Sequence, residues 1–216
     1  AGLIAPDADT ANWLARRAPD RSLIDGFSDS HWASDPDSHD GTLFSLDLDS
    51  LAPQAAAPHS PANAAAITDH DSPQFTVAYI GACTGAKLDD LRAAAGMLKG
   101  RTVASGTRLL VAPASRADQA QAADEGVMAI LESAGATILA TACGMCAGYG
   151  PNRLAADDVC ISSTARNFRG RMGAPGSRVW LASPASVAAA AVTGRLTDPR
   201  EMAPHESPGN TIGGRS

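Results

Sequence analysis

Hydrophobic and polar positions follow a regular pattern from Phe75 onward, where short apolar runs alternate with amphipathic stretches. The apolar runs predict five strands, at residues 75–82, 107–114, 136–143, 158–163 and 178–182. The amphipathic stretches predict helices at residues 87–100, 115–132 and 184–193. Strands that alternate with helices in this way indicate an α/β fold, which we expect to be a three-layer α/β/α arrangement around a mainly parallel sheet.

Residues at the expected helix ends support these assignments. Ser115 with Asp118 resembles a capping box, in which a side chain accepts a hydrogen bond from the exposed end of a helix. Ser183 followed by Pro184 is typical of an N-cap and a first helical position, and Gly194 stands just beyond the end of the same helix. Two of the three helices thus carry their own start signals.

The first 72 residues have a different pattern, with frequent Asp, Ser and Pro. DADTANWLARRA (7–18) predicts a short helix with Asp9 or Thr10 as its N-cap. TLFSLDLD (42–49) alternates apolar with polar positions and predicts a half-buried strand, whereas the Pro- and Ala-rich residues 51–73 predict a connector. The sequence therefore predicts three parts: an N-terminal strap and connector at 1–72, an α/β/α domain at 73–201 and a disordered tail at 202–216.

Composition and charge narrow the class of protein. Hydrophobic residues make up 44% of the 216-residue chain and aromatic residues only 4%, so we expect a core of small aliphatic side chains. A formal net charge of −6 without a Lys/Arg run argues against nucleic-acid binding. No apolar run approaches the roughly 18 residues of a membrane span, and the first ten residues lack the features of a secretory signal. Four unevenly spaced cysteines indicate a reducing, cytoplasmic compartment with free thiols.

Reactive side chains gather where three of the predicted strands end. They are Cys83 after the first strand, Cys143 and Cys146 after the third, and Arg166 and Arg171 after the fourth. The carboxyl ends of parallel strands lie at one edge of a sheet, and ligands bind there. We therefore expect these five side chains to face one edge.

The pair Cys143 and Cys146 is compatible with several chemistries, including two buried, inert thiols. A redox dithiol is expected after the first strand rather than the third. A zinc site would need Cys83 and Cys160 as well, but Cys160 lies within an apolar strand and is typical of a core thiol. Three thiolates without a fourth ligand suit a [4Fe–4S] cluster with one open iron, which can act as a Lewis acid. Nearby arginines would then bind a second substrate carboxylate, unless they are solvated loop residues.

The reactive side chains and the last helix lie in four longer motifs: IGACTGAKLDDLRAA, ACGMCAGYG, STARNFRGRMG and SPASVAAAAVTGRLTDPRE. Together these motifs resemble the cluster-bearing domain of the aconitase superfamily, in particular the large subunits of 3-isopropylmalate dehydratase and related alkylmalate dehydratases. The resemblance is loose in residues 19–50 and close from Phe75 to Glu201. It implies that Cys83, Cys143 and Cys146 bind a [4Fe–4S] cluster, and that Arg166 and Arg171 bind substrate. The implied reaction removes water from a 2-hydroxy dicarboxylic acid, such as 3-isopropylmalate or a related alkylmalate, and adds it back at the neighbouring carbon.

Two positions depart from the pattern of this superfamily. Gly85 and Ala165 stand where its members usually have asparagine. The second asparagine would form a hydrogen bond near the cluster, so its loss predicts a changed cluster potential or a changed substrate. These departures indicate a divergent branch.

Acid and base residues of the superfamily cannot be located in this chain. Relatives supply them from a segment ahead of AGLIAPD (1–7) and from a swivelling domain or small subunit. We assign no catalytic residue here, and no role to His31, His39, His59 or His70. We therefore expect a C-terminal part of a large subunit that works only with an N-terminal partner chain and a small swivelling subunit. The alternative is a non-catalytic iron–sulfur binding or regulatory module.

Overall fold

The computed structural model describes residues 6–17, 41–42 and 44–202, and the chain divides into two units at the boundary between Asp49 and Ser50. In the first unit, helix α1 spans Ala8–Ala15. Its N-cap is Asp7, because the Asp7 carboxylate accepts hydrogen bonds from both the backbone N–H and the hydroxyl of Thr10, each at 2.8 Å. The helix was therefore predicted correctly, but its expected N-cap at Asp9 or Thr10 was wrong.

The strand predicted at residues 42–49 does not form in the described part of that segment, which is residue 42 and residues 44–49. The side chains of Phe44, Leu46 and Leu48 are 89%, 69% and 70% exposed. Alternating polarity gives a strand one apolar face, but it does not supply a second strand to pair with. A strand without such a partner is not stable in water.

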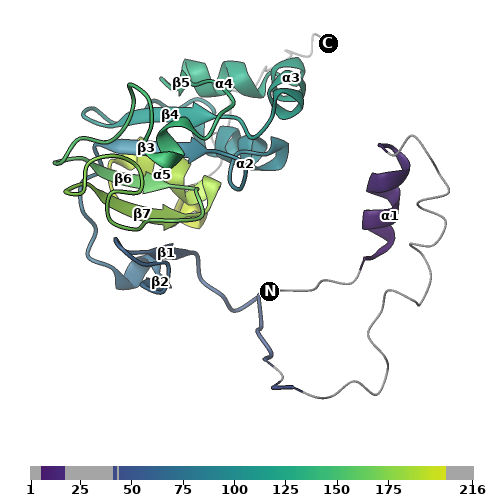
Figure 1. The fold of residues 1–216 in the computed structure, drawn as a ribbon, viewed down its shortest axis with the longest axis horizontal. Coiled ribbons are helices and arrows are strands. Elements are labelled where there is room, and N and C mark those ends of the chain that lie inside the picture. Colours follow the sequence, from purple (N-terminus) through teal and green to yellow (C-terminus); the bar gives the residue numbers. More distant parts are fainter. Residues whose placement is uncertain (1–5, 18–40, 43, 203–216) are drawn as a thin grey trace, which may run out of the picture. The chain divides into compact units, whose positions relative to one another are not determined.

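A seven-stranded sheet forms the centre of the second unit (Figure 1), with the strand order β2-β1-β7-β6-β3-β4-β5. The strands are β1 (Gln54–Ala56), β2 (Ala64–Ala66), β3 (Val77–Gly81), β4 (Arg108–Ala112), β5 (Thr137–Ile138), β6 (Val159–Ser162) and β7 (Arg178–Ala182). The neighbours from β7 to β5 run parallel, whereas β1 pairs antiparallel with both β2 and β7. The mainly parallel α/β sheet is confirmed.

Strands β1 and β2 lie in the segment that was predicted to be a connector. Ala55 and Ala56 are buried, and the ring of His70 forms a 2.8 Å hydrogen bond to the carbonyl of Ala55. The same ring packs edge-on against Trp180 at 5.0 Å between centroids. Three-residue alanine strands carry no hydrophobic period, so the sequence pattern missed them. These strands belong to the sheet although they precede residue 73, where the domain boundary stays a prediction.

Helices cover one face of the sheet. They are α2 (Leu88–Leu98), α3 (Arg116–Asp124), α4 (Val127–Ser133) and α5 (Pro184–Thr193), and each contacts at least one of the others. Ser115 caps α3 and Ser183 caps α5, as predicted. The single helix predicted at 115–132 is instead two helices, because Gly126 adopts a left-handed conformation with φ 74°. None of the described helices is long and apolar enough to cross a membrane.

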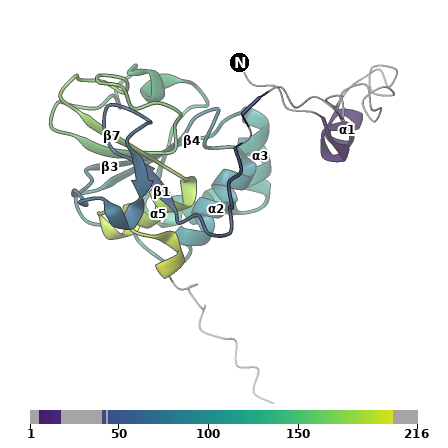
Figure 2. The same cartoon turned by 90° about the horizontal axis from the view of Figure 1, so that it is seen from below.

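Loops rather than helices cover the other face of the sheet (Figure 2). There, Val77, Tyr79 and Leu110 pack against Met145 and against two further buried residues, Leu154 and Met172. This loop layer includes the short 3-10 helix η4 (Gly144–Ala147). The three-layer arrangement that we expected has helices on this face, and the loop layer takes their place. Because β5 ends at Ile138 rather than at residue 143, the chain leaves the sheet earlier than predicted and enters this loop layer.

Candidate metal centre

The segment that carries Cys83 follows β3, and its thiol is exposed. The buried hydroxyl of Ser163, just after β6, holds this segment in place. It accepts a 3.0 Å hydrogen bond from the Gly81 N–H and lies 2.8 Å from the carbonyl oxygen of Gly85, to which it donates. Both ends of the Cys83 loop are thereby fixed to the neighbouring strand.

Gly85 makes an unusually close approach to this strand end. A Cβ atom at position 85 would lie 2.1 Å from the Ser163 carbonyl oxygen and 2.7 Å from its hydroxyl. Real Cβ atoms do not come so close to backbone, so the loop requires glycine here. The sequence alone did not reveal this close approach.

Cys143 and Cys146 lie at the start of η4 and within it. Cys143 is the N-cap and has an exposed thiol, and Cys146 is half-buried. Gly148 ends η4 in a left-handed conformation with φ 77° and donates to the carbonyls of this short helix. Buried Met145 anchors the turn against the sheet, so the two thiols flank a fixed apolar side chain.

Cys160 lies within β6 and is fully buried. Burial, with the nearby Asp158 carboxylate as a smaller cause, raises the pKa of this thiol far above its ordinary value. A thiol that stays protonated is a poor metal ligand. Cys160 is a core residue, in agreement with the sequence interpretation.

The two candidate arginines have different surroundings. The side chain of Arg171 is half-buried, and its Nη2 lies 3.9 Å from the sulfur of Cys146. The Nε of Arg171 is buried and has no hydrogen-bond partner among the described residues. Arg166 is exposed and makes no ion pair within the described chain. The structure therefore brings Arg171, but not Arg166, to a cysteine.

Asn167 fixes the loop that carries Arg166 and Arg171, and the sequence analysis did not identify this role. Its fully buried amide nitrogen donates to the carbonyls of Ala57 at 2.8 Å and Val179 at 3.2 Å. The loop is thus joined to the residue that follows β1 and to β7. The sequence signal was only that Asn167 lies between two candidate arginines.

The donor set has the chemistry of an iron–sulfur site, with three free thiols of which two are exposed and one is half-buried. Within residues 6–17, 41–42 and 44–202, no three metal-binding side chains already form one group. The structure brings Arg171 to Cys146, whereas it does not bring Cys83 into one group with the other two thiols. The three cysteines therefore fit by donor type and accessibility rather than by a preformed geometry.

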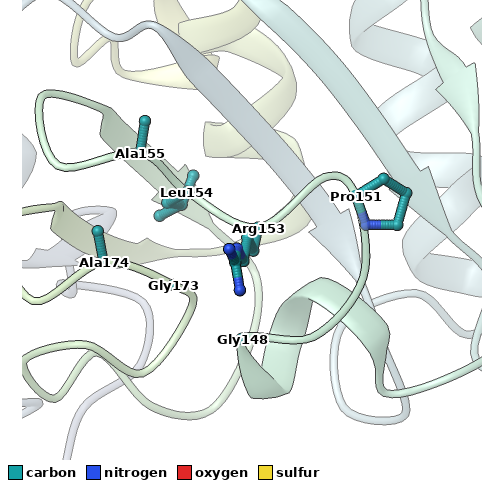
Figure 3. Close-up of a pocket in the computed structure, with 7 residues that line it drawn as sticks. All are labelled: Gly148, Pro151, Arg153, Leu154, Ala155, Gly173 and Ala174. Atoms are coloured by element: carbon teal, nitrogen blue, oxygen red, sulfur yellow. The ribbon is translucent and has the colours of Figure 1, made fainter.

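Two cavities lie near the Cys143–Cys146 turn. One of about 240 Å³ is mostly apolar and has Tyr79, Met145 and Tyr149 among its lining residues. The other, of about 480 Å³, has Gly148 and Arg153 among its lining residues (Figure 3). Pro151 lines both cavities.

Comparison with known proteins gives one family and many relatives. Residues 71–194 match the Aconitase family (aconitate hydratase). A 3-isopropylmalate dehydratase large subunit from Archaeoglobus fulgidus is 39% identical over 204 residues, which are 94% of this chain and 47% of that protein. One from Herpetosiphon aurantiacus is 45% identical over 156 residues, 72% of this chain and 37% of the relative. A homoaconitase large subunit from Thermus thermophilus is 39% identical over 207 residues, 95% of this chain and 46% of the relative.

The chain spans about half the length of most of these relatives, 46–47% for those aligned along nearly all of it. The family match extends from just before β3 to the end of α5, and so contains the three accessible cysteines and both candidate arginines. The matched region covers more than half of the 216 residues. The chain belongs to the aconitase family.

Proposed function

We propose that this chain is the cluster-bearing component of an aconitase-type hydro-lyase. Its substrate is a 2-hydroxy dicarboxylic acid such as 3-isopropylmalate or a related alkylmalate, which is dehydrated and then rehydrated. Membership of the family and the names of the relatives support this proposal. The observation that carries it is the position of Arg171, a half-buried cation with an unpaired Nε next to the sulfur of Cys146.

Cys83, Cys143 and Cys146 are the residues that would hold a [4Fe–4S] cluster. Such a cluster supplies a Lewis-acidic iron that polarises the hydroxyl group of a bound substrate. The loop tied down by Ser163 and the turn anchored by Met145 keep two separate backbone segments in fixed positions. Fixed segments reduce the ordering that the protein must undergo when three thiolates bind one group.

Arg171 binds and orients the substrate carboxylate in this proposal. A buried guanidinium N–H without an acceptor is costly, and a carboxylate oxygen would remove that cost with a charge-assisted hydrogen bond. Arg166 would supply a second cation from the same loop once substrate is present. Two guanidinium groups at one edge would distinguish dicarboxylates from monocarboxylates, because each planar fork matches one carboxylate.

The acid and base groups of the reaction come from outside this chain in our proposal. The relatives are named large subunits and are about twice as long as the matched region. We infer two partners, a polypeptide segment that corresponds to the N-terminal half of the large subunit and a small swivelling subunit. These would enclose the substrate and exclude water from it.

Anaerobic reconstitution with iron and sulfide tests the cluster. We expect about four irons per chain, as in a cubane cluster. Replacing Cys83, Cys143 or Cys146 with serine should abolish loading, whereas Cys160→Ser is the matched control and should load like the wild type. Stoichiometric zinc without sulfide would contradict the proposal.

Hydration and dehydration are then followed through the absorbance of the unsaturated intermediate, with the partner polypeptides added. Activity that requires the loaded chain is the expected result. A chain that loads four irons but never supports turnover with any partner would instead be a non-catalytic iron–sulfur module.

A further inference from the structure

The hydroxyl group of Tyr79 is a buried donor without an acceptor. Tyr79 lies in β3, its side chain has no exposed surface, and its oxygen has no hydrogen-bond partner among the described residues. Leaving such a group unpaired costs about 1–3 kcal/mol, so buried tyrosine hydroxyls nearly always have a partner. An apolar phenylalanine would fill the same space without that cost. The hydroxyl therefore points to an acceptor that lies outside the described residues.

The phenol group reaches the end of its own strand. A Cβ atom at Gly81 would lie 2.6 Å from the Tyr79 hydroxyl oxygen and 2.5 Å from the ring carbon that bears it. Gly81 precedes Cys83 by two residues, so the hydroxyl lies where the Cys83 loop begins. Glycine at this position leaves the space that the phenol occupies.

Tyr79 also adjoins the turn that carries the other two candidate ligands. It packs in one apolar cluster with Met145, and Cys146 lies against the same cluster. The hydroxyl thus lies near the start of the Cys83 loop, on a side chain that packs against Met145 and Cys146.

We propose that the Tyr79 hydroxyl donates a hydrogen bond to a sulfur atom of the iron–sulfur group that Cys83, Cys143 and Cys146 hold. The inference rests on the proposed function. A donor directed at a sulfur atom stabilises the more negative, reduced state of the group and raises its reduction potential. Tyr79 is therefore a positioning residue that sets the potential, and it touches no substrate.

The test is Tyr79→Phe, which removes one oxygen atom and keeps the ring. The chain has only two tyrosines, so Tyr149→Phe is the matched control. Tyr149 lines the same cavity but is 72% exposed. Both variants are loaded anaerobically, and their midpoint potentials are measured by redox titration monitored by electron paramagnetic resonance.

We expect the ratio of reduced to oxidised cluster at a given potential to fall about tenfold in Tyr79→Phe, which is a shift of about 59 mV to lower potential for a one-electron couple. The potential of Tyr149→Phe should equal that of the wild type. A Tyr79→Phe variant that loads normally and keeps the wild-type potential overturns the inference and leaves the proposed function intact. That result would mean that the hydroxyl bonds to water in the cavity. A wild-type chain that holds no cluster overturns both.

A second variant keeps the test decisive if Tyr79→Phe does not fold. In the Tyr149→Phe background, Tyr79 is the sole tyrosine, so 3-fluorotyrosine labels it alone. Fluorination makes the phenol a stronger donor while preserving its shape, and the potential should therefore rise. An unchanged potential would refute the hydrogen bond.

Discussion

Ser163→Ala should loosen the Cys83 loop without disturbing the sheet. The Ser163 hydroxyl is buried and joins the Gly81 N–H at 3.0 Å to the Gly85 carbonyl at 2.8 Å. Its removal deletes two hydrogen bonds of about 1 kcal/mol each and leaves a buried N–H without a side-chain acceptor. We expect the free energy of unfolding to fall by about 2–3 kcal/mol. The backbone hydrogen bond from the Ser163 N–H to the Tyr79 carbonyl remains, so the strand pairing survives.

Urea denaturation followed by circular dichroism measures this change. Ser162→Ala is a suitable control, because Ser162 is buried at the end of β6 and its hydroxyl bonds to the hydroxyl and the N–H of Thr164 rather than to the Cys83 loop. The control also loses two hydrogen bonds, so its free energy of unfolding should fall by a similar amount, but it should load iron normally. Ser163→Ala should lose bound iron faster than the control in the presence of a chelator. Equal iron retention in the two variants would refute the role given to Ser163.

Three further predictions follow from particular contacts. Gly85→Asn introduces the residue usual in the superfamily. It should destabilise the fold by about 1–3 kcal/mol in thermal unfolding, because its Cβ would meet the backbone of Ser163. Gly96→Ala, at an open position in α2, should instead stabilise the fold by up to about 1 kcal/mol. Arg171→Lys should keep the cluster but lower kcat/KM about 10- to 100-fold in the assembled enzyme, and an unchanged value would assign Arg171 to structure alone. Hydrogen bonds from Arg200 hold the pKa of Asp198 below its ordinary value, so stability should fall as the pH drops below about 4. Asp198→Asn should lose less stability over that range, measured by acid unfolding.

Helices and strands were predictable from the sequence where capping residues stood at the ends of a periodic hydrophobic pattern. Helix α5 has Ser183 as its cap and Gly194 at its end, and both features were readable before the structure was known. Helices α3 and α4 were predicted as one helix, because the hydrophobic pattern continues across Gly126. The two helices are separated by the positive φ of Gly126, which the pattern does not indicate. The strand predicted at residues 42–49 is a different error. The alternating pattern is present there, but no strand lies beside it to pair with it in the described chain.

The sequence indicated which residues form the candidate site, but not the hydrogen bonds that hold their loops in place. Cys83, Cys143 and Cys146 follow strands in the sequence, so topology alone directed attention to them. The hydrogen bonds of Ser163 join residues about 80 positions apart in the chain, and no local pattern indicates such a contact. The need for glycine at position 85 likewise comes from its close approach to Ser163, which no local pattern indicates.

The two faces of the sheet differ in a way that bears on how a cluster could be delivered. The helix-covered face contains the larger apolar core, whereas the loop layer packs through a small set of residues around Tyr79 and Met145. Local opening of a lightly packed layer costs less free energy than global unfolding. If a cluster binds as proposed, its assembly would therefore involve only local movement of the loop layer, while the helices and strands stay folded.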